Sequence, residues 1–372
     1  MRQLSVIVEQ GLAPVPGGTG RYAIQIGRAL AAATRPGWAV RPVTAWHRDL
    51  QPVRSAGLGR PARLPVGHRV LNELWLHGLP PWVQGEAVHA TTPLAPPRHD
   101  GLVVTVHDAV PWTHPDTLSP RGVHWHRVMV ERAVDRARAI VVPTLAVADD
   151  LAGLFPAAAD RLTVIGHGVT ELLVPADAEQ RRHRLGLPQR FVLAIATLEP
   201  RKGLDVLVEA MTRPALSGSH LALVGAVGWG GIDAGALAKQ SGLSPDRLHE
   251  LGRLDDRDLA AVLAGASVLA APSRSEGFGL PVLEAMAAGV PVVCSDAPAL
   301  VELVAGSAVV VPREDPDALA QALSDVLESP QDATDLSARG RRRAAAFTWS
   351  AAAAALWDLH AGPLDVVTDP RG

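Results

Sequence analysis

Short apolar runs, many of them rich in β-branched residues, alternate along the chain with longer segments of helical periodicity. The apolar runs lack the polar alternation of half-exposed strands, which indicates parallel strands covered on both faces. Their alternation with helices predicts an α/β fold with two doubly wound, Rossmann-like domains. The expected strands cover residues 4–8, 102–107, 139–144, 162–168, 191–197, 221–226, 267–273, 291–295 and 308–312. The clearest expected helices cover residues 20–33, 119–138, 203–211, 256–265, 316–328 and 347–360.

A polar, proline-bearing stretch at 170–189 separates two strand-rich segments. It predicts one domain over residues 1–172 and a second over 188–346, and 372 residues suit two such domains. The alanine-rich segment near the end is expected to be a helix that begins near Trp349 or is capped by Ser350. Trp349 and Trp357 are eight residues apart, so they share a face that we expect to pack against the protein.

Composition and charge narrow the function classes. The formal charge of −3 gives no reason to expect a nucleic-acid partner. Residues 1–172 hold 17 arginines and 13 acidic residues, a balance of +4, and the remainder holds 18 basic and 25 acidic residues, a balance of −7. The basic first half fits either an anionic ligand or membrane surface, or ordinary scatter of surface charge. The single cysteine, Cys294, excludes an internal disulfide and fits a reducing cytoplasm.

No targeting or membrane segment is expected. The first ten residues read as a strand because their apolar part is too short for a signal peptide. No apolar run approaches the roughly 20 residues of a membrane-spanning helix. We therefore expect a cytoplasmic protein.

The most informative motif is SEGFGLPVLEAMAAGVPVV, at 275–293. Gly277 and Gly279 allow the backbone to approach a ligand, and Pro281 fits the first turn of a helix, whose free N–H groups favour anions or sugar oxygens. Glu276 and Glu284 would lie at separate depths, roughly 12 Å apart along a helix, and each carboxylate can accept a pair of hydroxyl hydrogen bonds. Such a pair suits a ligand with two polyol parts. The alternative is that Glu276 caps the helix and Glu284 is exposed.

Three further motifs follow expected strands. In TLEPRKGLDVLVEA (197–210), Arg201 and Lys202 can neutralise a diphosphate, or they are solvated surface charges. In PGGTGRYAIQIGRAL (16–30), the glycines open a helix without the spacing of a dinucleotide- or phosphate-binding loop, so a plain glycine turn is the alternative. In TVHDAVPWTHP (105–115), His107 can bind a sugar hydroxyl, and Asp108 can orient His107 or a nearby acceptor. The alternative is that His107 is a satisfied histidine at a strand end. The histidines show no metal-ligand spacing, so no metal site is predicted.

Together these motifs resemble glycosyltransferase family 4, the retaining nucleotide-sugar transferases of GT-B fold, over nearly the whole chain. The most specific element is the pair of glutamates separated by seven residues, Glu276 and Glu284, followed by EPRKG (199–203) and PGGTGRY (16–22). The resemblance implies two domains facing across a cleft. It also implies that a final helix, residues 348–362, crosses back to the first, acceptor-binding domain, leaving the second as the donor-binding domain.

The resemblance implies a role for each residue of the donor loop. Glu276 would hold the donor sugar, helped by the backbone N–H groups of Phe278, Gly279 and Leu280. Gly277 belongs to the same loop.

The rest of the donor site is implied in the same way. Glu284 would hold the ribose, and Leu254 would contact the base through its backbone. Gly18 would approach the phosphates from the first domain, and His107 would contact the donor sugar near the reacting carbon. The acceptor-side candidates are Asp108, Gly20, Arg21 and Tyr22.

The resemblance also implies that Arg201 and Lys202 bind the diphosphate and stabilise it as it leaves. One departure concerns this role, since many relatives carry an arginine after the preceding strand, where this chain has Thr197. The expected reaction is metal-independent transfer with retention, by front-face attack, in which the departing phosphate takes the acceptor proton. The expected donor is GDP-mannose, with UDP-glucose, UDP-N-acetylglucosamine and a deoxysugar donor as alternatives.

The expected acceptor is a glycan or a lipid-linked saccharide. Arg21, Arg28 and Arg35 are seven residues apart on one helix, so they form either a basic stripe for anionic lipid at the inner face of the membrane or a solvated face. Alternatives of other classes are a non-catalytic nucleotide-sugar-binding partner subunit and a nucleotide-sugar epimerase. The paired glutamates and EPRKG argue against the epimerase. A Rossmann dehydrogenase is disfavoured, because no G-x-G-x-x-G follows a strand with an acid about twenty residues on.

Overall fold

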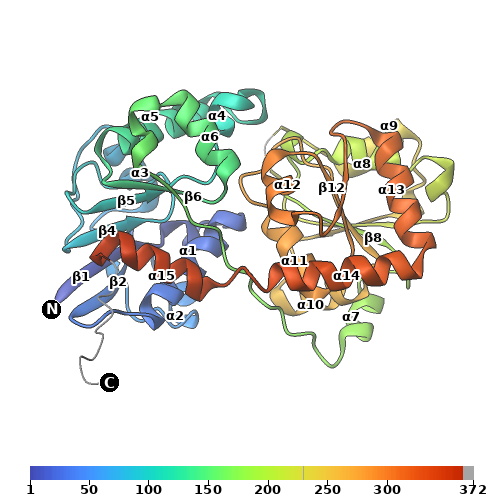
Figure 1. Cartoon of the computed structure of the whole chain (residues 1–372), viewed down its shortest axis with the longest axis horizontal. Coiled ribbons are helices and arrows are strands. Elements are labelled where there is room, and N and C mark those ends of the chain that lie inside the picture. Colours follow the sequence, from blue (N-terminus) through green and yellow to red (C-terminus); the bar gives the residue numbers. More distant parts are fainter. Residues whose placement is uncertain (229, 363–372) are drawn as a thin grey trace, which may run out of the picture.

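A computed structural model describes residues 1–228 and 230–362. The described chain forms two α/β halves, each built on one parallel sheet with helices on both faces, which confirms the predicted fold class (Figure 1). The first sheet has the order β3-β2-β1-β4-β5-β6-β7. Its strands are β1 (Arg2–Ile7), β2 (Trp38–Thr44), β3 (Ala62–Arg63), β4 (Ala87–Ala90), β5 (Leu102–Thr105), β6 (Ala139–Val142) and β7 (Leu162–Val164). Its helices are α1 (Gly17–Ala32), α2 (Gln51–Ser55), α3 (His68–Leu76), α4 (Val110–Thr113), α5 (Pro120–Arg136) and α6 (Leu145–Leu154).

The second sheet has the order β10-β9-β8-β11-β12-β13. Its strands are β8 (Val192–Ile195), β9 (Leu221–Val224), β10 (Leu248–Gly252), β11 (Val268–Ala271), β12 (Val292–Ser295) and β13 (Val309–Val311). The helices of this half are α7 (Ala178–Arg184), α8 (Leu204–Ala210), α9 (Ala234–Ser241), α10 (Asp256–Gly265), α11 (Leu280–Ala288), α12 (Pro298–Val304), α13 (Pro316–Glu328) and α14 (Pro330–Ala344).

Continuous apolar strands arise because both faces of each sheet are covered. In β5, Val103 and Val104 enter hydrophobic cores on opposite faces of the first sheet. In β8, Val192 and Leu193 do the same in the second. Alternate side chains of a strand point to opposite faces, so a strand between two cores needs apolar residues at every position.

The strand order fixes where a ligand site belongs. All strands are parallel, but the order in which the chain adds them to the sheet changes direction at one point. This switch point lies between β1 and β4 in the first sheet and between β8 and β11 in the second. In open α/β sheets, ligands bind beyond the carboxyl ends of the strands at such switch points. The EPRKG loop follows β8 and the loop with Glu276 follows β11, so the second switch point brings these two motifs together.

The last helix, α15 (Trp349–Ala361), returns to the first half, where it lies beside α1 (Figure 1). It begins at Trp349, which confirms one of the two predicted starts. Its N-cap is Thr348, whose hydroxyl accepts a hydrogen bond from the Ala351 N–H at 3.1 Å, so the other prediction, a cap at Ser350, is wrong. Trp357 is buried, and its Nε1 donates to the Leu30 carbonyl at 3.2 Å. The last strand of the first half ends at Val164 and the first strand of the second half begins at Val192. No strand of the described chain lies between them to mark a boundary, so the domain limits at 172 and 188 stay a prediction.

The sequence pattern missed several strands. β4 is a central strand of only four residues, and it contains His89. β3 and β10 are edge strands, and β10 has charged and partly exposed residues. Short or edge strands lack the long apolar run by which a buried strand is recognised. Among the described residues, no helix combines the length and hydrophobicity needed to cross a bilayer.

Candidate functional site

The loop after β11 leads into α11 through glycine. Gly279 is the N-cap residue with φ of 101°, a backbone conformation that side chains rarely adopt. No side chain caps the helix, and Pro281 lies in its first turn. The alternative in which Glu276 caps α11 is therefore contradicted. Among residues 1–228 and 230–362, no side chain is found hydrogen-bonded to the N–H groups of this first turn.

Glu276 is instead held by an ion-pair cluster. Its Oε1 accepts hydrogen bonds from Lys202 Nζ at 2.6 Å and from Ser273 Oγ at 2.8 Å, and its Oε2 accepts from Arg201 Nη1 at 3.2 Å. Burial alone would raise the pKa of Glu276, but the charges of Lys202 and Arg201 lower it to about 2. The carboxylate is therefore ionised throughout the physiological range.

Arg201 lies between two carboxylates. Its second arm donates to Glu199 Oε1 at 2.6 Å. Burial lowers the pKa of Arg201, but Glu276, Glu199 and Asp108 raise it further, so the guanidinium stays charged. Arg201 and Lys202 are mostly buried, which contradicts the alternative of a solvated pair. Glu199 lies inside the motif at 197–210 and Ser273 ends the expected strand 267–273, but the sequence alone gave neither residue a role.

Loops of the first half meet this cluster. Gly277 lies so close to the His107 carbonyl that an ideal Cβ on Gly277 would be 1.9 Å from that oxygen. Thr144, the N-cap of α6, donates its hydroxyl to the Gly277 carbonyl at 3.1 Å. An ideal Cβ on Gly18 would lie 3.6 Å from Leu280 Cδ1, so the first turns of α1 and α11 also meet. The structure thus brings the predicted glycine, histidine and glutamate motifs to one junction.

His107 is presented as a neutral acceptor. Its Nε2 donates to the Thr91 carbonyl at 2.8 Å, which leaves Nδ1 without a proton. Burial lowers the pKa of His107, although the hydrogen bond to Thr91 and the charge of Asp108 oppose that shift. Asp108 does not hydrogen-bond the imidazole, since its Oδ1 accepts from the Val110 N–H at 3.1 Å. A hydrogen bond with Asp108 therefore does not orient His107, and the alternative, that Asp108 orients a nearby acceptor, stays a prediction.

Glu284 has its own cation, and that cation comes from the other half. Arg21 Nη1 lies 2.6 Å from Glu284 Oε1, and Arg21 Nη2 lies 2.9 Å from Asp256 Oδ1. The Glu284 side chain is only 6% exposed, so the alternative of an exposed helix residue is contradicted. Burial raises the pKa of Glu284, and the charge of Arg21 opposes the rise. Arg21, predicted on the acceptor side, in fact contacts the donor-side glutamate.

Two more acceptor-side expectations are corrected. Tyr22 is 2% exposed, and its hydroxyl shares a hydrogen bond with Thr105 Oγ1 at 3.1 Å. Its ring packs edge to face against the His107 ring with centroids 4.8 Å apart, so Tyr22 helps to fix the position of His107. Gly20 lies under the preceding loop, where an ideal Cβ would be 2.8 Å from the Gln10 carbonyl oxygen. Both residues are buried, Tyr22 in the core beneath α1 and Gly20 against the loop that precedes it.

The basic stripe on α1 is also corrected. Arg21 is engaged by Glu284 and Asp256, while Arg35 is 10% exposed and paired with Asp358 of α15. Only Arg28 of the three is an exposed side chain. The helix therefore presents no continuous basic face.

Phe278 is buried against His167 and Phe347. The roles predicted for its N–H group and for the backbone of Leu254 stay predictions.

A cavity of about 780 Å³ opens in the first half beside His107. Its wall combines the expected residues His107 and Asp108 with side chains of α3 and α5 that the sequence did not single out. No motif marks them, because they follow ordinary amphipathic helical patterns. Those polar and aromatic lining residues are His68, Arg69, Asn72, Glu73, Arg121, Trp125 and His126.

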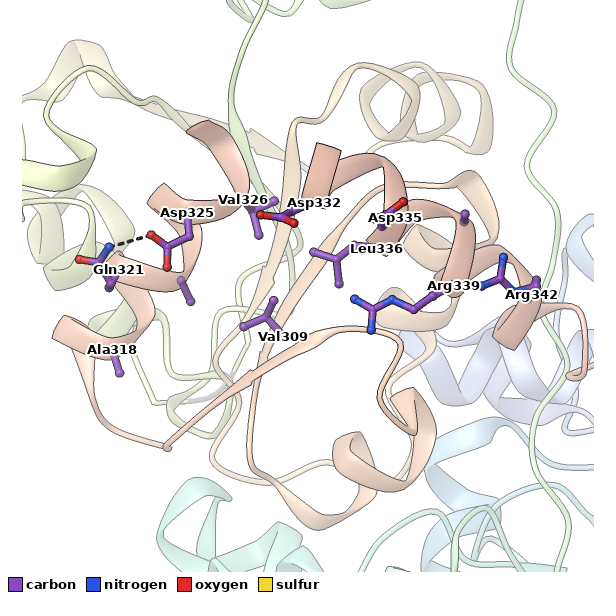
Figure 2. A pocket seen from close by; sticks show the side chains of 12 residues that line it. Val309, Ala318, Gln321, Asp325, Val326, Asp332, Asp335, Leu336, Arg339 and Arg342 are labelled. Carbon is purple, nitrogen blue, oxygen red and sulfur yellow. Dashed lines mark hydrogen bonds between the residues drawn. The ribbon is translucent and has the colours of Figure 1, made fainter. Parts of the chain in front are cut away.

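A second cavity, of about 740 Å³, lies between α13 and α14 (Figure 2). Its floor is apolar, with Val309, Val326 and Leu336, and charged side chains such as Asp335 and Arg339 stand at its rim. None of the predicted site residues lines it. Within residues 1–228 and 230–362, no group of three or more histidine, cysteine or acidic side chains is arranged to hold a metal ion.

Known proteins show the same family features. The family model for glycosyl transferases group 1 matches residues 176–343, which contain the EPRKG and double-glutamate motifs. The chain is 35% identical over 256 residues to D-inositol 3-phosphate glycosyltransferase of Thermobispora bispora, and the match covers 64% of this chain but only 59% of that relative's length. The enzyme of the same name from Xylanimonas cellulosilytica is 34% identical, over 77% of this chain and 70% of its own. O-antigen chain mannosyltransferase B of Escherichia coli is 29% identical, over 68% of each chain.

Solved structures share the fold over nearly the whole chain. Sucrose-phosphate synthase of Thermosynechococcus elongatus superposes with a TM-score of 0.75 at 24% identity, covering 97% of this chain and 98% of that one. HepE of Anabaena, solved with UDP and glucose, gives a TM-score of 0.73 at 20% identity, covering 96% and 99%. The motifs, their convergence at one junction and these matches agree, and the chain belongs to the group 1 glycosyltransferases.

Proposed function

We propose that this protein is a retaining glycosyltransferase that moves a hexose from a nucleotide sugar to a glycan or a lipid-linked acceptor. The observation that carries the proposal is the Glu276 cluster. A buried, ionised carboxylate lies beside Arg201 and Lys202, at the uncapped N-terminus of α11 and against the backbone of His107. One junction thus offers an acceptor for sugar hydroxyls together with cations and N–H groups for a diphosphate.

The donor is proposed to lie along this junction. The sugar hydroxyls would bind Glu276 and Nδ1 of His107, and the ribose would bind Glu284. The diphosphate would lie near Arg201 and Lys202, at the first turns of α1 and α11. The acceptor would enter the cavity beside His107, which is lined by residues of α3 and α5.

The proposed chemical step needs no metal ion or other cofactor. The bond between the anomeric carbon and the diphosphate oxygen breaks, and the acceptor oxygen bonds to the same face of that carbon. The acceptor proton passes to the departing diphosphate. Arg201, Lys202 and the α11 N-terminus stabilise the negative charge that develops on the leaving group, which is the type of contribution that preorganised donors make to catalysis.

GDP-mannose is the proposed donor. The similarity to a relative named as a mannosyltransferase supports it, together with the TLEPRKG motif. A UDP-sugar donor is the second candidate, because HepE of Anabaena has the same fold and was solved with UDP-glucose. The reaction would take place in the cytoplasm, at the inner face of the membrane where the acceptor is lipid-linked. Such peripheral association does not rest on the arginines of α1.

A thermal-shift panel tests the proposal. The ligands are GDP-mannose, GDP, UDP-glucose, UDP-N-acetylglucosamine and, as a negative control, NAD. A ligand at a hundred times its dissociation constant stabilises the folded state by about 2.7 kcal/mol. GDP-mannose and GDP should raise the melting temperature of the wild type, and Glu284→Ala should abolish the effect. Stabilisation by uridine nucleotides alone would replace mannose with a UDP-sugar.

Turnover separates an enzyme from a binding subunit. The protein should release GDP slowly from GDP-mannose without an acceptor, and EDTA should not change that rate. Binding without any release would favour the non-catalytic partner subunit. No stabilisation by any nucleotide sugar at millimolar concentration would refute the donor site.

A further inference from the structure

Arg21 connects the two halves through a carboxylate that the proposed donor also needs. It lies in the first turns of α1, in the first half, and it reaches Glu284 on α11 at 2.6 Å and Asp256 on α10 at 2.9 Å. The two acids differ in exposure, since the Glu284 side chain is 6% exposed and that of Asp256 is 72% exposed. The ion pair with Glu284 is thus the buried arm of this contact, and the pair with Asp256 is the exposed arm.

The buried Glu284 carboxylate depends on Arg21 for its hydrogen bond. Within the described chain, Arg21 is the hydrogen-bond partner found for the Glu284 side chain. A buried carboxylate without a partner is costly, because it loses its hydration without compensation. The two hydroxyls of a ribose can also donate to this carboxylate, one to each oxygen. Arg21 Nη1 lies 2.6 Å from Oε1 of a side chain that is only 6% exposed, so a ribose that binds both oxygens competes with the guanidinium for Oε1.

The other hydrogen bonds between the halves do not compete with the proposed donor. Thr144 donates to the Gly277 carbonyl, Arg253 donates to the Pro14 carbonyl at 2.9 Å, and Glu302 accepts from the Leu145 and Ala146 N–H groups. None of them uses the carboxylates proposed to bind the donor. Of the hydrogen bonds found between the described halves, the one from Arg21 to Glu284 is accepted by the carboxylate that is proposed to bind the ribose.

We propose that Arg21 is a clasp on Glu284, and that the ribose of a nucleoside diphosphate must displace it from that carboxylate. This inference rests on the proposed function, because it takes Glu284 as the ribose residue. After displacement, Arg21 keeps its exposed partner Asp256. The clasp therefore lowers donor affinity while it stabilises a buried carboxylate.

The clasp is tested by comparing two proteins, with and without Arg21, against two ligands, with and without the ribose hydroxyls. The dissociation constants of GDP and of 2′,3′-dideoxy-GDP are measured for the wild type and for Arg21→Met, with the uridine pair if uridine nucleotides prove to bind. The variant should bind GDP about tenfold more tightly, since a hydrogen bond to a charged group no longer has to be broken. It should bind the dideoxy compound as the wild type does, because that ligand does not compete for Glu284.

The matched control is Arg28→Met, an exposed arginine two turns further along the same helix. It should leave both constants unchanged. Weaker binding of GDP by Arg21→Met, or the same ratio for both ligands, would overturn the clasp. If the wild type binds no nucleoside diphosphate, the proposed function fails and the clasp fails with it. If the wild type binds GDP and Arg21→Met has the same dissociation constants for both ligands as the wild type, only the clasp is refuted.

A crystal structure of the wild type with GDP provides a test that does not depend on how the variant folds. Arg21 Nη1 should lie beyond hydrogen-bond distance of Glu284, and both ribose hydroxyls should bind that carboxylate. Retention of the contact between Arg21 and Glu284 with ribose in place would contradict the proposal.

Discussion

At the scale of single residues, Glu276 and Glu284 are buried carboxylates whose cations come from different halves. Lys202 and Arg201 hold Glu276 from within the second half, whereas Arg21 reaches Glu284 from the first. The two sites should therefore respond differently to mutation. Under the proposed function, loss of a cation at Glu276 should affect the chemical step, whereas loss of Arg21 should affect the competition for the ribose.

Lys202 can be compared with the only other lysine of the chain. We predict that Lys202→Met lowers kcat/KM on the order of 10²-fold or more, because it removes a donor aimed at the leaving group and at Glu276. Lys239→Met, at an exposed position of α9, should leave kcat/KM unchanged. The measurement is initial-rate kinetics on the donor identified by the ligand panel. Equal rates in the two variants would remove Lys202 from the site.

Buried histidines link β4 to the last helix. His89 and His360 pack edge to face with ring centroids 5.4 Å apart, and both are almost fully buried. Burial lowers the pKa of His89 to about 3 and lowers that of His360 well below its ordinary value. Both side chains are therefore neutral in the folded protein at neutral and mildly acidic pH.

These histidines should make the protein less stable in acid. An unfolded histidine has a pKa near 6.5, so below that pH the unfolded chain binds more protons than the folded one and stability falls. Each such histidine should cost about 2 kcal/mol of unfolding free energy between pH 7 and pH 5. His360→Phe should flatten this dependence in urea unfolding, whereas His124→Phe, an exposed position on α5, should not. Parallel pH profiles for wild type and His360→Phe would contradict the prediction.

At the scale of secondary-structure elements, α15 completes the first half. Its Trp357 fills the space beside α1, with the ring centroid 5.6 Å from that of Trp38. Arg35, three residues after the end of α1, pairs with Asp358 of α15. The helix is last in the sequence but belongs to the core around the first strands.

Truncating Trp357 measures this docking. Trp357→Ala should lower the unfolding free energy by about 3–5 kcal/mol, the range typical of buried aromatic residues. Trp46→Ala, at a tryptophan that is 53% exposed, should change it by about 0.5 kcal/mol or less. Chemical denaturation followed by circular dichroism distinguishes the two. A small effect at Trp357 would show that α15 contributes little to the first half.

At the scale of the whole molecule, the junction is built from backbone as much as from charge. Glu302 of α12 accepts hydrogen bonds from the Leu145 and Ala146 N–H groups at 2.9 and 3.1 Å, so an acid of one half satisfies a helix N-terminus of the other. Gly277 permits the contact with the His107 carbonyl because it has no Cβ. The relative position of the halves therefore depends on a few residues.

Gly277→Ala should separate the halves without unfolding either. A Cβ 1.9 Å from the His107 carbonyl oxygen cannot be accommodated unless the contact opens. We expect kcat/KM to fall on the order of 10²-fold, as a displacement of about 1 Å in a catalytic arrangement can cause. Small-angle scattering should show a larger radius of gyration at a nearly unchanged melting temperature. Gly218→Ala, where a Cβ meets no atom within 4 Å, is the control that should behave as the wild type does.

The sequence by itself determined the local structure and the position of the motifs. Continuous apolar runs predicted strands such as β5 and β12, and the glycine–proline pattern of 277–281 predicted the start of α11. Both follow from interactions between neighbours in the chain, which a linear pattern records. The sequence also placed Arg201, Lys202 and Glu276 on loops beyond the carboxyl ends of strands, but that these loops are adjacent follows from the strand order of the sheet.

Only the tertiary structure decided which groups meet. Arg21 and Glu284 are 263 positions apart, and whether they pair depends on how two separately formed halves seat against each other. Tyr22, the neighbour of Arg21, turns inward to Thr105, because successive residues of a helix point in different directions and the inner face of α1 packs on the sheet. No local pattern carries that information, since charge and polarity along the chain do not specify a partner in another domain.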